Sequence, residues 1–336
     1  MPVDPASVPF SHGLHRLSDA CYAWLQPGGG FCLNNAGLVV SNGETLLIDT
    51  LTDIKRTREM LEGMAAAVPA AARIDQLVNT HGDLDHTAGN CLLHDTRRLM
   101  SRVGAAHYSH IEQSVDRILA STGEMRQLMN ELGLGTTFDP RGVKHIEPTL
   151  TFDGYLEVPV GSISAHCHEF GPAHNRSDTV VHVADEGVVY AGDLMFCNCH
   201  PVLGFWPVEN WVVACDALLG WNAEVFVPGH GPVAGPAEVR RHRDYVILLH
   251  EEARARYARG MSVDEAALDI FDTFEEFRHL LRADILRKNV NVVYHELRNE
   301  PMVENVEAQS IARWLFRERI RGRARGIEIG HVPDGN

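Results

Sequence analysis

The sequence predicts an α/β fold that continues into a helical extension, and three observations support this prediction. Short strand-like runs alternate with helical runs over the first two thirds of the 336 residues. Helical periodicity with almost no strand signal follows Gly235, and 45% of the residues are hydrophobic, as in a protein with a buried core. We therefore expect a mixed domain over residues 1–235 and a helical extension over residues 236–336.

The first part of the mixed domain is predicted to contain a hairpin, two helices and a buried strand. The turn Ser41-Asn42-Gly43 is typical of a hairpin, because Asn and Gly accept the positive φ angles of a tight turn. Strands are expected over residues 36–40, 45–49 and 74–79. The spacing of apolar residues predicts helices over residues 53–67 and 105–132.

The second part of the domain is richer in strands, and the extension is helical. Strands are expected over residues 156–160, 162–168, 179–183, 188–191 and 224–227, and a helix over residues 211–219. Further helices are expected over residues 239–260, 261–271, 286–299 and 308–320. Ser262 and Glu265 have the spacing of a capping box at a helix start, and the basic segment 317–325 is typical of a solvated last helix.

The charge and the cysteines narrow the expected partners and compartment. The 45 acidic and 30 basic residues give a formal net charge of −15, which repels nucleic-acid phosphates and anionic membranes. We therefore expect a small-molecule substrate, with neither nucleic acid nor a membrane as a partner. The N-terminus has no secretory-signal pattern, and the seven cysteines lack disulfide-framework spacing, so we expect reduced thiols and a cytoplasmic protein.

A dense cluster of potential metal ligands follows the predicted strand at 74–79. His81, Asp83, Asp85 and His86 lie within six residues. A loop that leaves the end of a strand can direct alternate side chains to a common point, as a bound cation requires. This segment alone is equally compatible with a polar loop whose aspartates cap a helix and whose histidines face solvent.

Three later segments favour the metal site over the polar loop. His174 lies in a loop between two predicted strands, Asp193 ends another predicted strand, and His230 ends a third within Pro-Gly-His-Gly. In each segment an apolar strand delivers one metal-capable side chain to a turn of small residues. Together with the first cluster, these segments predict a metal centre. The large number of histidines, 19 in all, agrees with this prediction but does not locate the centre.

The ordered set of four motifs resembles the metallo-β-lactamase superfamily, whose signature is a His-x-His-x-Asp-His loop followed by a His, an Asp and a final His at strand ends. The resemblance covers about residues 30–235. It implies an αββα metallo-β-lactamase sandwich with the helical C-terminal extension added, and two divalent metal ions. By position, it implies one metal held by His81, Asp83 and His174, a second held by Asp85, His86 and His230, and Asp193 bridging the two.

One residue departs from the signature, since Asp83 stands where the family has a second histidine. Zinc is the metal first expected, but a carboxylate is a harder donor than an imidazole and makes iron or manganese more competitive. Flavodiiron proteins of this superfamily also carry a carboxylate at this position, although the flavodoxin-like domain of those proteins is not recognisable after residue 235. The exchange is also compatible with a weakened first site and a single bound metal.

The resemblance implies a metal-dependent hydrolase that uses a metal-bridging hydroxide on a small ester, thioester, lactone or activated ether. Asp85 is the candidate to orient the nucleophile or carry its proton, in addition to binding metal. His200, in the loop after Asp193, is a candidate donor to a developing oxyanion, and the alternative is a packed loop histidine. The alternative function is a non-haem di-iron oxygenase or oxidase on the same fold, to which Asp83 points. A noncatalytic metal-stabilised binding protein is a third possibility, disfavoured by the complete ligand set.

The helical extension resembles that of a subgroup described as cyclase-like or hydroxyacylglutathione-hydrolase-like. The resemblance rests on Gly260-Met261-Ser262 and on the segment at 289–294. It implies helices near the opening of the site, where they shape a pocket or form a homo- or hetero-oligomer contact.

Overall fold

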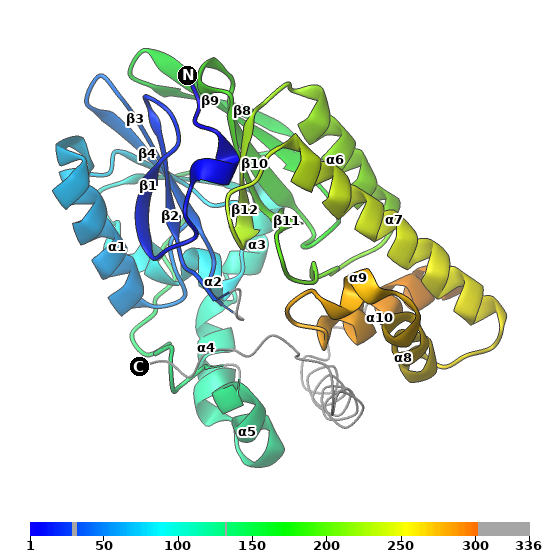
Figure 1. Cartoon of the computed structure of the whole chain (residues 1–336). Helices are drawn as coiled ribbons and strands as arrows, with labels where there is room; N and C mark the ends of the chain where they lie inside the picture. Colours follow the sequence, from blue (N-terminus) through cyan, green and yellow to red (C-terminus); the bar gives the residue numbers. More distant parts are fainter. Residues whose placement is uncertain (29–31, 132, 302–336) are drawn as a thin grey trace.

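Two β-sheets pack face to face, and helices cover both outer faces (Figure 1). This computed structural model describes residues 1–28, 32–131 and 133–301. The helix expected at 308–320 and the basic segment 317–325 lie outside the described residues. Among the described helices, none combines the length and the apolarity needed to cross a membrane. The two packed sheets with helices on both outer faces confirm the αββα sandwich expected from the sequence.

The first sheet has seven strands in chain order. They are β1 (Gly13–Arg16), β2 (Cys21–Leu25), β3 (Ala36–Ser41), β4 (Glu44–Ile48), β5 (Gln76–Val78), β6 (Arg97–Ser101) and β7 (Leu150–Phe152). The strands up to β4 are antiparallel, and those from β4 onward are parallel. Asn42 and Gly43 both have positive φ in the predicted hairpin turn. The sequence did not indicate β1, β2, β6 or β7, because each has at most five residues and no clear alternation of polar and apolar side chains.

The second sheet has five strands in the order β12-β11-β10-β9-β8. Their bounds are Tyr155–Val160 for β8, Ile163–Phe170 for β9, Asp178–Val183 for β10, Val188–Phe196 for β11 and Val225–His230 for β12. Only β11 and β12 run parallel. The predicted strands match these five, except that β9, β11 and β12 continue beyond their predicted ends to Phe170, Phe196 and His230. In β11 the register shifts after Tyr190 and Gly192. The extension of β11 carries Asp193.

Alternating side chains divide the apolar residues into separate cores. In β4, Leu46 and Ile48 belong to the core between the sheets, whereas Leu47 packs with the outer layer that contains Met60. In β12, Phe226 likewise faces the opposite core from its neighbours. A strand places successive side chains on opposite faces, so both sheets bury apolar residues on two sides.

The first helix on the outer side of the first sheet is α1 (Ile54–Ala67). Asp53 is its N-cap, and the Asp53 carboxylate accepts a hydrogen bond from the Arg56 amide at 2.7 Å. The predicted single helix at 105–132 is wrong. The structure has α3 (Arg102–Tyr108), α4 (Ile111–Ala120) and α5 (Gly123–Glu131) there. The break between α4 and α5 lies where Ser121 adopts an extended ψ of 142° and Gly123 a positive φ. Figure 1 shows α4 and α5 projecting from the end of the sandwich at which the short helix α2 (Leu84–Thr87) lies.

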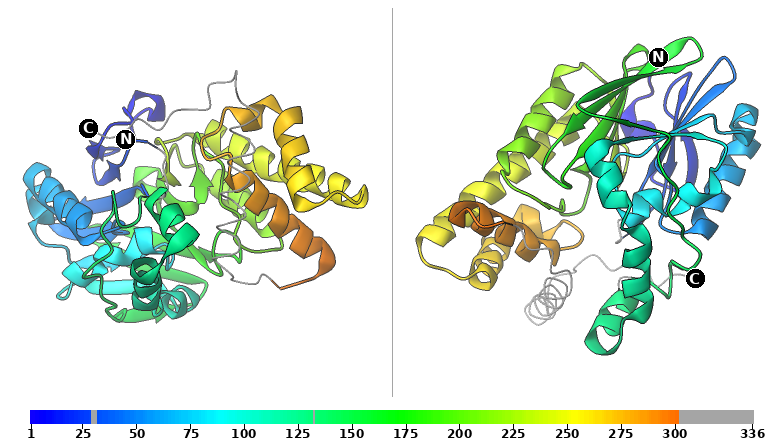
Figure 2. Two further views of the ribbon diagram at one scale, coloured as in Figure 1. Left: turned by 90° about the horizontal axis from the view of Figure 1, so that it is seen from below. Right: turned by 180° about the vertical axis from the view of Figure 1, so that it is seen from behind.

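The remaining helices lie on the side of the second sheet: the first two pack against β11, and the other three form a group with the second helix. They are α6 (Glu209–Gly220), α7 (Pro236–Ala258), α8 (Val263–Thr273), α9 (Glu275–Arg278) and α10 (Ile285–Arg298). Figure 2, seen from below, places α1 on one side of the sheets and these helices on the other. The predicted capping box at Ser262 and Glu265 is present. One apolar cluster joins β10–β12 and α6 to α7–α10, so residues on both sides of position 235 share a core.

Burial of His242 in this core predicts a pH dependence of stability. His242 is 6% exposed, and its Nε2 accepts the indole N–H of Trp211 at 3.0 Å, so the ring is neutral. Burial lowers the pKa of His242 to about 4. Below the unfolded-state pKa, near 6.5, His242 binds a proton in the unfolded chain but not in the folded chain. The contribution of the neutral ring to the free energy of unfolding is therefore lost as the pH falls from about 6.5 toward 4.

We expect wild-type protein to lose about 2 kcal/mol more of its free energy of unfolding between pH 7 and pH 5 than His242→Gln, whose amide accepts the same bond without titrating. Urea unfolding at both pH values, with a chelator present throughout, measures this difference. His182 and His200, whose pKa values burial also lowers to about 4, contribute equally to both proteins. Equal pH slopes for the two proteins would contradict the prediction.

Candidate metal centre

The seven predicted ligands come together from both sheets. His81 follows β5, and Asp85 and His86 belong to α2, which Asp83 precedes as N-cap. His174 lies in the loop between β9 and β10. Asp193 comes from β11, and β12 ends at His230. The two sheets thus bring together side chains that are up to 149 positions apart in the sequence.

Three groups of these side chains have ligand atoms within 4.8 Å of one another. The groups are His81, Asp83 and His174; His81, His86 and Asp193; and Asp85, His86 and His230. Asp193 lies between the two ends of the cluster: its Oδ1 is 3.2 Å from His86 Nε2, and its Oδ2 is 3.3 Å from His174 Nε2 and 3.4 Å from His230 Nε2. This central place agrees with the bridging position that the resemblance implies.

Asp49, at the end of β4, determines the orientation of His86 and, through Thr80, of His81. Its carboxylate accepts hydrogen bonds from the Thr80 amide and hydroxyl, both at 2.7 Å, and from Nδ1 of His86 at 2.8 Å. Because the Thr80 hydroxyl donates to Asp49, it accepts from Nδ1 of His81 at 3.0 Å. Both imidazoles therefore carry a proton on Nδ1 and direct Nε2 at the cluster.

Backbone carbonyls orient the other two histidines in the same way. Nδ1 of His174 donates to the carbonyl of Val202 at 2.8 Å, and Nδ1 of His230 donates to that of Leu33 at 3.2 Å. All four histidines thus use Nδ1 for an outer hydrogen bond and leave Nε2 for the centre. This arrangement is typical of metal-ligating imidazoles, whose outer hydrogen bond sets the tautomer.

The centre leaves polar atoms without partners in a way that a cation would satisfy. Nε2 of His81, Nε2 of His86 and Oδ1 of Asp193 are buried and make no hydrogen bond. Buried polar atoms are normally hydrogen-bonded, and three such atoms in one cluster need a shared partner. Imidazole nitrogens and carboxylate oxygens are ligands of divalent metals, so the donor set fits the expected ions.

The charges of the cluster also attract positive charge. Burial lowers the pKa of His174, but the carboxylates of Asp193 and Asp83 outweigh burial and raise it to about 9. Burial likewise opposes the ionisation of Asp193, but His230 and His86 hold its pKa well below the ordinary value. In the absence of metal, protons on the imidazoles balance the carboxylates, and divalent cations compete for the same nitrogens.

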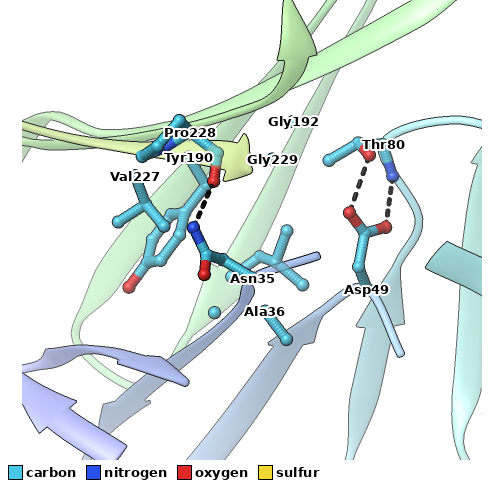
Figure 3. Close-up of a pocket in the computed structure, with 11 residues that line it drawn as sticks. Asn35, Ala36, Asp49, Thr80, Tyr190, Gly192, Val227, Pro228 and Gly229 are labelled. Carbon is cyan, nitrogen blue, oxygen red and sulfur yellow. Dashed lines mark hydrogen bonds between the residues drawn. The ribbon is translucent and has the colours of Figure 1, made fainter. Parts of the chain in front are cut away.

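A small pocket between the sheets lies directly behind this centre (Figure 3). Figure 3 shows Asp49 beneath Thr80, with both carboxylate oxygens directed at that residue. Across the pocket, the side chain of Asn35 donates to the carbonyls of Pro228 and Gly231, at 2.9 and 2.8 Å. Asn35 thereby holds the turn that carries His230 against the start of β3.

Gly229 allows the closest approach within the centre. A Cβ atom at this position would overlap Oδ1 of Asp193 and approach the backbone of Gly192. Only a residue without a side chain lets β12 lie against the carboxylate here. The close approach to Asp193 therefore explains why the Pro-Gly-His-Gly turn has a small residue before His230.

His200 is not brought to the centre, and its predicted role as an oxyanion donor is wrong. The ring is 1% exposed, its Nε2 bonds to the carbonyl of Phe277 at 2.9 Å, and its Nδ1 pairs with the hydroxyl of Tyr245 at 2.7 Å. Burial lowers its pKa to about 4. With both nitrogens used inside the core, the ring has no donor for a substrate, and the packed loop histidine is the correct interpretation. Asp85, in contrast, lies at the centre, with Oδ2 3.5 Å from Nε2 of His230.

Sequence reasoning missed the residues that orient the ligands. Asp49 ends a predicted strand on a carboxylate, which is the same signal that identified Asp193, and this signal could have found it. Thr80 is adjacent to His81 but carries no signal of its own. The carbonyls of Leu33 and Val202 have no sequence signal at all, because any residue supplies a carbonyl.

Two packed sheets with a cluster of four imidazoles and three carboxylates define the class of α/β metallohydrolases. The profile of the metallo-beta-lactamase superfamily matches residues 29–230, which is more than half of the chain. The chain belongs to this superfamily.

Known proteins extend the comparison. The linear primary-alkylsulfatase of a Pseudomonas strain is 27% identical over 158 residues, which cover 44% of this chain and 30% of that protein. The match thus spans less than a third of the relative's length. The stereoselective inverting sec-alkylsulfatase Pisa1 from Pseudomonas sp. superposes with a TM-score of 0.66 at 17% identity, over 94% of this chain and 57% of its own. A metallo-beta-lactamase from Pontibacter korlensis gives 0.54 at 16% identity, over 70% of this chain and 99% of its own. These structural likenesses show the shared fold.

The close approach at Gly229 predicts a loss of metal on substitution. We expect Gly229→Ala to displace Asp193 and to bind at most one zinc ion per chain after incubation with zinc and dialysis, as measured by elemental analysis. Gly220→Ala is the matched control, because a Cβ at the end of α6 meets nothing within 4 Å. Equal metal content in the two variants would show that the contact does not constrain Asp193.

Proposed function

We propose that the chain is a hydrolase that depends on two divalent metal ions, with zinc the first candidate. His81, Asp83 and His174 would hold one ion, Asp85, His86 and His230 the other, and Asp193 would bridge them. The observation that carries the proposal is the convergence of four Nε2 atoms, each fixed by an outer hydrogen bond on Nδ1, around a buried carboxylate. Such a preset donor arrangement costs little reorganisation on binding metal.

When bound, such ions supply an activated water and stabilise negative charge that develops on the substrate. The chain contributes the surroundings of this chemistry. The histidines are buried, whereas the side chains of Asp83 and Asp85 are 34% and 16% exposed, so the centre is open on the side of these two carboxylates. Asp85 is therefore placed to accept a hydrogen bond from a water that enters from that side and to receive its proton.

The substrate class that we propose to test first is a sulfate ester of an alcohol. Support comes from the names of two similar proteins, a linear primary-alkylsulfatase and a sec-alkylsulfatase. The matches cover 30% and 57% of these two relatives, and the substrate of this chain is therefore a matter for measurement. Carboxylic esters, thioesters, lactones and activated ethers form the comparison set.

A second candidate function is a di-iron oxygenase or oxidase. The observation that favours it is Asp83, which gives the first group an additional oxygen donor where the family signature has an imidazole. A small-molecule substrate is expected in both cases, and an oligomer contact through the C-terminal helices remains a prediction.

Metal analysis combined with anaerobic turnover separates the two functions. We expect protein purified without added metal to contain two ions per chain, chiefly zinc, and to hydrolyse a medium-chain alkyl sulfate equally well with and without oxygen. Ion chromatography of released sulfate measures the reaction, and the comparison esters are run in parallel. Two irons together with oxygen consumption would replace the hydrolase by the oxidase. Apo protein that takes up neither metal would refute both functions.

The bridging place of Asp193 predicts the effect of its removal. We expect Asp193→Ala to bind at most one ion and to lose most of the turnover, because the Asp193 carboxylate lies 3.2–3.4 Å from histidines of both groups. Asp216→Ala is the control: this exposed acid on α6 pairs with Arg243 and belongs to none of the ligand groups, so turnover should stay at the wild-type level. Near-wild-type turnover of Asp193→Ala would contradict the dinuclear assignment.

A further inference from the structure

Asp83 offers two oxygens where a histidine would offer a single nitrogen, and the two oxygens have different surroundings. Oδ2 faces the centre, 3.2 Å from Nε2 of His174 and 3.6 Å from Nε2 of His81. Oδ1 faces away from them and accepts a hydrogen bond from the side-chain amide of Asn175 at 2.8 Å. It also lies 3.6 Å from Nδ1 of His107. The carboxylate is thus divided between an inner and an outer oxygen.

Asn175 is itself held firmly in place. Its backbone amide donates to both carboxylate oxygens of Asp178, at 3.1 and 2.9 Å, and the residue is 6% exposed. Its side-chain oxygen accepts from the Arg176 amide at 2.9 Å and is 3.1 Å from Nδ1 of His107. Because that amide oxygen can only accept, Nδ1 of His107 is the donor, and the Asn175 NH₂ group is directed at Asp83.

Helix α3 reaches this place because residue 82 is a glycine. A Cβ at Gly82 would lie 2.9 Å from the carbonyl of Gly104, 2.9 Å from the amide of Tyr108 and 3.1 Å from Cβ of His107. Any side chain at position 82 would push α3 away from the loop between His81 and Asp83. The close packing of α3 on this loop therefore brings His107 to Asn175 and to the outer oxygen of Asp83.

We propose that Asn175, supported by His107, is a positioning residue that reserves one oxygen of Asp83 for an outer hydrogen bond and leaves the other as a single metal ligand. This restriction lets a carboxylate occupy the place of an imidazole, since it removes the second oxygen from the coordination of the first metal. The inference rests on the proposed metal binding and adds to it a reason for the departure at position 83. Outer hydrogen bonds to metal ligands typically change metal affinity by about 10- to 100-fold.

The competing explanation is that Asn175 only ties two loops together. The two explanations differ in their dependence on Asp83. If Asn175 only ties the loops together, its removal weakens zinc binding whatever residue is at position 83. If Asn175 restrains the outer oxygen of Asp83, its removal has no such effect when position 83 is a histidine, because a histidine has no second oxygen. A double-mutant cycle between Asn175→Ala and Asp83→His separates them.

The cycle is measured on the full chain after metal removal. Zinc affinity comes from competition with a chromophoric chelator, stoichiometry from elemental analysis, and folding from circular dichroism. We expect Asn175→Ala to weaken one of two zinc sites about 10- to 100-fold when Asp83 is present, and by less than about threefold in Asp83→His. His107→Ala is expected to act in the same direction with a smaller effect, because His107 acts through Asn175. Equal losses in both backgrounds, or no loss in either, would overturn the proposal.

Cobalt substitution gives a readout that does not depend on Asp83→His retaining metal. In Asn175→Ala the outer oxygen of Asp83 is released and can join the coordination, which raises the coordination number and weakens the visible d–d absorption of cobalt(II). An unchanged cobalt spectrum in this variant would also overturn the proposal.

A matched control variant and the wild-type protein distinguish a failure of the role of Asn175 from a failure of the proposed metal-dependent function. Asn210→Ala removes an amide that donates to the carbonyl of Pro172 and makes no contact with Asp83, so wild-type zinc affinity and cobalt absorption are expected. Wild-type protein that binds two ions and hydrolyses its substrate, while the cycle shows no coupling, would refute the role of Asn175 alone. Wild-type protein that binds no metal would refute the proposed function together with it.

Discussion

The hydrogen bonds of one buried carboxylate, Asp49, hold the metal-binding loop to the first sheet. Asp49 is 2% exposed and accepts from the Thr80 amide, the Thr80 hydroxyl and His86. A buried carboxylate is costly unless its oxygens are satisfied, so these bonds constrain the whole turn after β5. Through Thr80 the same carboxylate sets the tautomer of His81. The orientation of the ligands thus depends on a residue that would not itself bind metal.

The two sheets contribute unlike parts of the centre. The first sheet supplies a loop in which His81, Asp83, Asp85 and His86 are close in sequence, and the second supplies His174, Asp193 and His230 singly. The halves meet only because the apolar residues between the sheets pack them face to face. The helices after residue 235 add to this support, since Asn289 of α10 bonds to Pro201 and Leu203 in the loop that also orients His174.

Asp83 shows how a change of ligand type affects its surroundings. A histidine at this position needs one outer acceptor for its second nitrogen, as His174 and His230 have in backbone carbonyls. A carboxylate instead needs an outer donor, and the structure supplies one in Asn175. The glycine at position 82 then acquires a role, because it lets α3 bring His107 to the same network. A departure from the family signature is thus matched by neighbouring polar groups from other segments.

The sequence by itself predicted the class of fold and the seven candidate ligands that the structure brings together, because both have local signals. Alternation of apolar residues marks most strands, and metal-capable side chains at strand ends mark the centre without any knowledge of packing. Short strands such as β1 and β7 escaped prediction because pairing within the sheet outweighs weak local preferences there. Only the tertiary structure decided which polar groups orient the ligands and that His200 is a core residue. These facts depend on partners such as Leu33, Val202 and Phe277, which lie 28 to 197 positions from the histidines that they bind and contribute only a backbone carbonyl, a group that every residue has.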